Sequence, residues 1–189
     1  MSKIFWVDLE TTGVDVRKND IHHIAIQVEI EGMVVEELDI RSRPNPKAKI
    51  EPKALEVGGV TLDEINAYPP SVEAYKQITG LLNAYVDRYN PKDKFHLGGY
   101  NNRQFDDPFL RAWFQRHGDQ FFGAYFWSDS IDVLVLASQH LITQRHRMPS
   151  FKLKDVAAWL DIAVDENALH NANYDLHLTT EIYKKVTNQ

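Results

Sequence analysis

Acidic residues stand at three places in the sequence where an apolar segment ends or is interrupted. Asp8 and Glu10 close the apolar run KIFWVDLE, and the two-residue period of a strand places both side chains on one face. Asp106 follows a second apolar run, FHLGGY, close to the start of an expected helix. Asp175 lies inside the apolar stripe that the last helix shows at about 100° per residue. A carboxylate on such a face is costly unless it is paired, bound to a metal ion or open to a cleft.

The chemistry that suits these four carboxylates is that of hard divalent cations. If they converged without counter-ions, they would repel one another strongly. Oxygen ligands of this kind select Mg²⁺ or Mn²⁺, and they need no cysteine. Two such ions about 3.5–4 Å apart activate a water and stabilise the leaving oxygen in phosphodiester hydrolysis. Each carboxylate alone also fits a strand end, a helix cap or a hydrogen-bonded buried aspartate, so the prediction depends on their combination.

One histidine stands near the last of these carboxylates. His170 precedes Asp175 by five residues, which is about 140° around a helix, so the two cannot share a face if both are helical. We therefore expect His170 before the first turn, on a movable segment. In the helix expected to end at Gly118, Asp107 is the predicted N-cap and Pro108 the first helical residue. This leaves Asp106 without a structural role.

The elements that must position these residues are strands and helices in mixed order, which predicts an α/β fold. We expect a strand over residues 3–10, and a hairpin over 23–43 that turns at Glu31-Gly32 and whose first strand alternates β-branched apolar residues with other residues. A further strand is expected over 95–101. Helices are expected over 71–89, from Pro108 to a stop at Gly118, from Asp132, after a cap at Ser150, and at the C-terminal end.

Composition and charge narrow the class of protein. The chain has 189 residues, of which 43% are hydrophobic and 25% are charged, and this predicts a single domain over residues 1–189. No run approaches the roughly 18 apolar residues of a membrane span, and the N-terminus does not read as a signal peptide, so we expect a cytoplasmic protein without membrane contact. The net charge of −6 argues against a protein that coats long duplexes.

Three motifs resemble those of the DEDDh 3′–5′ exonucleases, the family of polymerase proofreading subunits, ribonuclease T and oligoribonuclease. They are DLETTG, NNRQFD and HNANYD, and the last follows the histidine-type pattern of the family. ALEVGGVTLDEI and SFKLKDVAAWLDI resemble two further segments, so that the likeness covers about residues 4–183. The chain departs from the pattern at Gly58, where many relatives have a histidine.

The resemblance implies a ribonuclease H-like fold with a mixed five-stranded sheet flanked by helices. It implies that the four carboxylates bind two Mg²⁺ or Mn²⁺ ions and that His170 is the general base toward the attacking water. The terminal nucleotide would lie against Thr11, Thr12 and Phe105. The implied substrates are the 3′ ends of single-stranded DNA or RNA, released as nucleoside 5′-monophosphates, and a homodimer or association with a polymerase is compatible with the family.

Other interpretations stay open at this stage. The scaffold could serve a catalytically silent nucleic-acid-binding adaptor, or a phosphohydrolase of small nucleotide esters; a ribonuclease H-type endonuclease fits the histidine spacing less well. The basic loop 144–154 reads either as a solvated loop or as an arm that contacts phosphates. His22 and His23, which flank a strand start, are expected at the surface.

Overall fold

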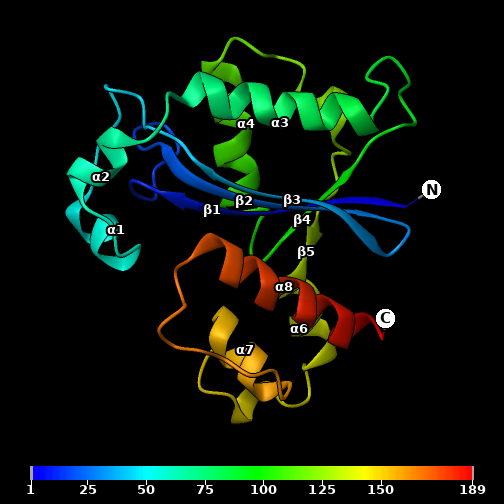
Figure 1. The fold of residues 1–189 in the computed structure, drawn as a ribbon. Helices are drawn as coiled ribbons and strands as arrows, with labels where there is room; N and C mark the ends of the chain where they lie inside the picture. Colours follow the sequence, from blue (N-terminus) through cyan, green and yellow to red (C-terminus); the bar gives the residue numbers. More distant parts are fainter. Residues whose placement is uncertain (1, 189) are drawn as a thin grey trace.

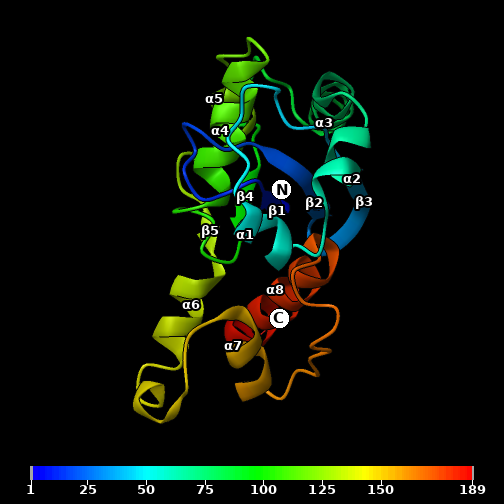
Figure 2. The ribbon, with the colours of Figure 1, turned by 90° about the vertical axis from the view of Figure 1, so that its left-hand side faces the viewer.

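The computed structural model describes residues 2–188, which build a five-stranded mixed sheet with helices on both faces (Figures 1 and 2). The strands are β1 (Lys3–Thr11), β2 (Ile21–Ile30), β3 (Met33–Arg41), β4 (His96–Gly99) and β5 (Ile131–Asp132). Their order in the sheet is β3-β2-β1-β4-β5. The pairs β1–β2 and β2–β3 are antiparallel, whereas β1–β4 and β4–β5 are parallel. The mixed five-stranded sheet predicted from the sequence is confirmed.

The helices form a layer on each face of the sheet, with a small helical cap at one end (Figure 1). In Figure 1, α3 (Ser71–Tyr85) and α4 (Asp106–Arg116) lie above the sheet, and α6 (Val133–His140), α7 (Leu153–Trp159) and α8 (Ala172–Thr187) lie below it. The cap consists of α1 (Pro52–Val57) and α2 (Leu62–Ala67), and α5 (Phe122–Tyr125) is a single turn after α4. Among residues 2–188, no helix has the length and apolar character needed to cross a bilayer.

The central strand β1 serves both layers by alternating its side chains. Phe5, Val7 and Leu9 belong to the apolar core between the sheet and the layer of α3 and α4, whereas Ile4 and Trp6 belong to the core between the sheet and the layer of α6–α8. The period of two therefore sends the next two side chains of the second row, those of Asp8 and Glu10, toward α8. The row that begins as core ends as a pair of carboxylates, as the sequence predicted.

A glycine on β4 makes room for the largest side chain of that row. Trp6 is fully buried and pairs with Gly98 across the parallel β1–β4 ladder. A Cβ on Gly98 would lie 2.4 Å from the Trp6 ring, so any larger residue would push the indole out of its place. The indole packs edge-on against Tyr183 of α8, which anchors the C-terminal half of the helix over β1.

The hairpin and the last helix agree with their predictions. Glu31 and Gly32 take positive φ angles of 51° and 79°, as a two-residue hairpin turn requires, and they join β2 to β3. α8 begins after Asn171, whose side chain accepts the amide proton of Asn173, and its buried residues include the Ala172–Leu176–Ile182 stripe.

Three predicted helix starts or ends were wrong by a few residues. α3 ends at Tyr85 instead of residue 89, because Val86 turns to extended geometry and Asp87 donates its amide proton to Asp93. α4 begins at Asp106, so Asp107 is not the N-cap; it forms an ion pair with Arg111 one turn later.

The start of α7 also differs from the prediction. The helix begins at Leu153, with Lys152 as its N-cap, so Ser150 lies two residues before the cap position. The Ser150 hydroxyl still ties down the helix entry, because its oxygen accepts the amide proton of Lys152 at 3.0 Å and it contacts the carboxylate of Asp155.

Candidate active site

Three of the predicted carboxylates meet where the end of β1 approaches the first turn of α8. One oxygen each of Asp8, Glu10 and Asp175 lies within 4.8 Å of the other two. Asp8 and Glu10 reach this point through the alternation of β1, and Asp175 reaches it from the sheet-facing side of α8. Carboxylates so close together have the spacing and donor type of a divalent-cation site.

Asp106 lies beside this group, in the first turn of α4, and is only 3% exposed. Its Oδ1 accepts the amide proton of Leu9 at 3.1 Å, so the expectation that Asp106 has no structural role was wrong. The bond links α4 to β1 between the two acidic residues of the strand. Of the three carboxylates whose charges raise the pKa of Asp8, Asp106 acts most strongly, so it lies at the edge of the same charge cluster.

Burial and mutual repulsion raise the pKa of these carboxyl groups. The pKa of Asp8 is raised well above its usual range by burial first, and then by the charges of Asp106, Glu10 and Asp175. Burial and the Asp175 charge raise the pKa of Glu10 to about 8, although Arg41 opposes the shift. The cluster therefore favours bound protons or, in their place, bound cations.

Asp175 offers a direct indication that the cluster suits a metal ion. Its Oδ2 accepts the backbone amide proton of His170 at 3.2 Å, whereas its Oδ1 is buried and has no hydrogen-bond partner among residues 2–188. A buried carboxylate oxygen without a partner is unfavourable unless a cation occupies the space in front of it. Hard oxygen donors without cysteine fit Mg²⁺ or Mn²⁺.

His170 lies outside the helix that carries Asp175, as the sequence predicted. It is exposed and has a left-handed φ of 63°, two residues before α8 begins. Non-glycine residues in this conformation are uncommon and concentrate at functional sites. The backbone amide of His170 donates a hydrogen bond to Asp175. Burial raises the pKa of Asp175, and the nearby His170 side chain opposes this rise.

The residues predicted to contact a terminal nucleotide fall in two groups. Phe105 and Thr11 line a pocket of about 410 Å³ beside Glu10, together with apolar side chains of α1 and of the loop after β1. Thr12 is not among the lining residues, and it is fully buried. Its hydroxyl donates to the carbonyl oxygen of Lys49 and accepts the amide proton of Asp20, so it holds two loops together.

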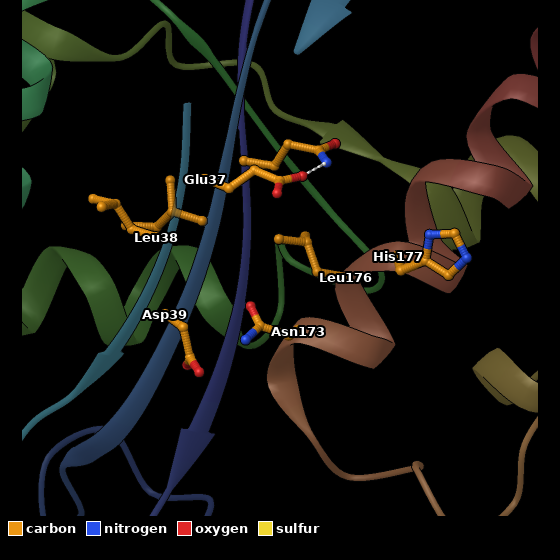
Figure 3. A pocket seen from close by; sticks show the side chains of 8 residues that line it. Glu37, Leu38, Asp39, Asn173, Leu176 and His177 are labelled. Atoms are coloured by element: carbon orange, nitrogen blue, oxygen red, sulfur yellow. Dashed lines mark hydrogen bonds between the residues drawn. The ribbon is translucent and has the colours of Figure 1, made fainter. Parts of the chain in front are cut away.

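A separate groove of about 300 Å³ lies between the β2–β3 hairpin and α8, and it holds none of the predicted site residues (Figure 3). Asn173, Leu176 and His177 line it from α8, and Glu37 and Asp39 line it from β3. Gln27 donates to Glu37 at 2.8 Å within this groove. Its carboxylates are not part of the metal-compatible group, so we do not assign the site to it.

Sequence reasoning missed three polar residues that surround Glu10. Contrary to the prediction of surface positions, His22 and His23 are 1% and 2% exposed. β2 is an inner strand covered on both faces by helices, so the start of the strand is buried as well. His23 pairs with Glu10 on β1 and with Arg41 on β3, which places these three side chains in one row across the sheet. The register could not be read from the spacing of histidines along the chain.

The metal-free protein is expected to lose stability as the pH rises from about 4.5 to about 8. The pKa of Glu10 goes from 4.5 to about 8 on folding, so between these values the folded state binds more protons than the unfolded state. The free energy of unfolding then falls with rising pH. Thermal melts in chelator between pH 5 and 8 measure this slope. Glu10→Gln, which cannot ionise, should make it shallower, and Asp8 and Asp175 would keep the remainder; an unchanged slope would show that Glu10 is not a source of it.

Comparisons with known proteins place the chain in a family. The family model described as exonuclease, RNase_T, matches residues 5–183, nearly the whole chain. The chain therefore belongs to this exonuclease family, which confirms the family predicted from the three motifs. It is also 25% identical over 176 residues to DNA polymerase III PolC-type of Mycoplasmopsis pulmonis (strain UAB CTIP); the match covers 93% of this chain and 11% of the polymerase.

Solved structures with the same fold include those of exonuclease I. The E. coli enzyme in complex with a dT13 oligonucleotide matches 99% of this chain and 41% of its own with a TM-score of 0.78 and 21% identity. Exonuclease I of Methylocaldum szegediense matches 100% and 41% with a TM-score of 0.76 and 19% identity. The predicted ribonuclease H-like fold is confirmed, and the chain spans about two fifths of the length of these neighbours.

Proposed function

We propose that this protein is a metal-dependent 3′–5′ exonuclease that acts on single-stranded nucleic acid and releases nucleoside 5′-monophosphates. The observation that carries the proposal is the juxtaposition of the three-carboxylate cluster with the pocket at Glu10. A site that cuts a phosphodiester next to a pocket of about 410 Å³, which would receive one terminal nucleoside, is suited to trimming chain ends. The family membership supports the same class of reaction.

The four carboxylates would hold two Mg²⁺ or Mn²⁺ ions. Asp8, Glu10 and Asp175 already share one space, and Asp106 adjoins it. When bound, the ions supply Lewis-acid activation of a water and neutralise charge on the leaving oxygen. The protein contributes the fixed geometry: the Leu9 amide holds Asp106, and the His170 amide holds Asp175.

The pocket would receive the terminal nucleoside. Its volume of about 410 Å³ is within the range of small-molecule sites, and its lining is mainly apolar. Phe105 offers a ring for contact with a base, and Thr11 borders the same space. Such contacts do not depend on the identity of the base, which suits a nuclease that removes successive residues.

His170 would act as the general base. Its ring is exposed at the entrance to helix α8, next to the carboxylate cluster, so it can exchange protons with solvent after each turnover. The proposed partners are single-stranded DNA or RNA ends. The exonuclease I complex with dT13 supports DNA, and the PolC-type relative supports association with a polymerase.

A substrate labelled at its 5′ end is expected to shorten one nucleotide at a time in the presence of Mg²⁺ or Mn²⁺. Parallel digestions of single-stranded DNA, single-stranded RNA and a dinucleotide, read on sequencing gels, give the polarity and the preferred substrate. Early internal cuts, or immediate release of the 5′ label as a mononucleotide, would contradict the 3′–5′ assignment. Hydrolysis of small nucleotide esters alone would point to a phosphohydrolase, and retained binding without hydrolysis would point to an adaptor.

A further inference from the structure

His22 is a buried histidine whose ring has no partner. The side chain is 1% exposed, and neither Nδ1 nor Nε2 has a hydrogen bond among the described residues. A neutral imidazole carries one N–H donor and one acceptor, and burying both unpaired is unfavourable. Such groups in folded proteins call for an explanation, and a functional role is one of the recognised ones.

A β-bulge places this ring beside the carboxylate cluster. In the β1–β2 ladder, Glu10 pairs with His23 and Thr11 pairs with Ile21, so His22 is the extra residue of the bulge and has no partner on β1. Bulges next to active sites redirect side chains out of the regular alternation. The bulge here occurs at the register position of Glu10, one of the residues proposed to bind metal.

Gly58 leaves a small space that both Glu10 and His22 border. A Cβ on Gly58 would lie 3.7 Å from Glu10 Oε2 and 3.9 Å from His22 Cε1, the ring carbon between the two nitrogens. Among residues 2–188 the Glu10 carboxylate has no hydrogen bond or ion pair, and Arg41 acts on it only through its charge. An unpaired donor and an unpaired acceptor therefore border one gap.

We propose that His22 is a positioning residue for Glu10. One ring N–H would donate a hydrogen bond to the Glu10 carboxylate, directly or through a water in the space beside Gly58, and hold the carboxylate in the orientation needed to bind a cation. Groups that hold metal ligands in this way set the orientation and basicity of the ligand. The inference rests on the proposed function, because it assigns Glu10 the role of a ligand.

The test measures Mn²⁺ affinity from the rise in melting temperature on titration, without any activity assay. His22→Leu is expected to weaken Mn²⁺ binding by about 10–100-fold, the usual effect of losing such a partner. The same variant should melt no lower than wild type in chelator, since it replaces an unpaired buried polar ring with an apolar side chain. If the His22 ring only fills space, His22→Leu should instead melt at a lower temperature than wild type in chelator and bind Mn²⁺ with unchanged affinity.

Ser42 offers a matched control on the adjacent chain segment. Its amide donates to the His22 carbonyl at 3.0 Å, and its hydroxyl is likewise buried without a partner among residues 2–188, but the atoms nearest to a Cβ at Gly58 belong to Ala54, Glu10 and His22 and not to Ser42. Ser42→Ala should leave Mn²⁺ affinity at the wild-type value. An equal loss in both variants would trace the effect to general disturbance of β2 and overturn the proposal.

A relocated histidine makes the test stricter. Gly58 has φ −75° and ψ −1°, a helical conformation open to any residue, so Gly58→His can bring an imidazole to the same space from the other side. In the His22→Leu background this change should recover part of the lost Mn²⁺ affinity. No recovery would overturn the assignment of the space beside Gly58.

Failure of this inference can be told apart from failure of the proposed function. If the wild-type protein shows no Mn²⁺-dependent stabilisation, the metal site itself is wrong. If the wild type is stabilised and His22→Leu is stabilised equally, the metal site stands and the role of His22 is overturned. As a direct readout, the ring ¹⁵N resonances of His22 should move when Mg²⁺ is added to the wild type, and unchanged resonances would contradict the hydrogen bond.

Discussion

Asp8→Asn is expected to abolish nuclease activity and most of the Mn²⁺-induced rise in melting temperature, while the metal-free protein keeps its fold. Asp8 is the carboxylate on which the other three act: their charges, after burial, raise its pKa. An amide at this position removes one ligand and part of the repulsion together. The variant should therefore melt at or above the wild-type temperature in chelator and below it with Mn²⁺ present.

The measurement is a pair of thermal melts, with and without Mn²⁺, beside an activity assay. Saturation to 100 times the dissociation constant of a single site stabilises a protein by about 2.7 kcal/mol. For a chain of this length about 1 kcal/mol corresponds to roughly 2–4 °C. The wild type should thus rise by at least several degrees. An inactive Asp8→Asn that keeps the full wild-type rise would show that Asp8 is not a ligand.

Glu29 provides the control for this experiment. It is a buried carboxylate on the same face of the sheet, 8% exposed, and it accepts a hydrogen bond from the Trp6 indole at 3.0 Å. Glu29→Gln keeps an acceptor for that bond and lies outside the metal-compatible group. It should leave both the Mn²⁺ response and the activity unchanged, so a loss confined to Asp8→Asn reflects the site rather than the removal of a buried charge.

The parts of the fold that could be predicted are those with a local signal. The alternation in β1 indicated that Asp8 and Glu10 share a face, and the Glu31-Gly32 turn indicated the hairpin. Asp175 could be singled out because it interrupts a helical stripe. Each of these signals lies within about a dozen residues of sequence, and the hydrophobic period is strongest on that scale.

The features that could not be predicted depend on contacts between distant segments. The hydrogen bond from the Leu9 amide to Asp106 joins residues 97 positions apart, and no periodicity reports it. The burial of His22 and His23 depends on the position of β2 inside the sheet and on the helices of both layers. Helix starts failed for a related reason: Asp106 is held by β1, so α4 begins two residues earlier than the Asp107-Pro108 pair indicated.

The carboxylate cluster itself combines both kinds of information. The sequence predicted which residues belong to it, through apolar patterns and the resemblance to the exonuclease motifs. It did not predict that His170 holds Asp175 through a backbone amide, because a side-chain argument about helix faces does not address the main chain. This bond matters for how the histidine should be tested.

Replacement of His170 by asparagine is expected to lower kcat by about 10²–10⁴-fold, the usual contribution of a general base. Mn²⁺ affinity should stay nearly unchanged, since the four carboxylates remain and the amide at position 170 still donates to Asp175. Asparagine is the better substitution because it tolerates the left-handed φ of 63° that alanine adopts only with strain. His170→Ala should show the same loss of kcat, with a lower melting temperature.

His177 supplies the matched control, an exposed histidine in the second turn of α8 that lines the neighbouring groove (Figure 3). His177→Ala should keep wild-type kcat and Mn²⁺ affinity. Asp175→Asn should lower both, because it removes a ligand, whereas His170→Asn should lower kcat alone. This contrast separates a base from a ligand five residues away. If His170→Asn turns over at a rate near wild type, another group takes the proton from the attacking water, and the exposed imidazole at the entrance to α8 has no part in the chemistry.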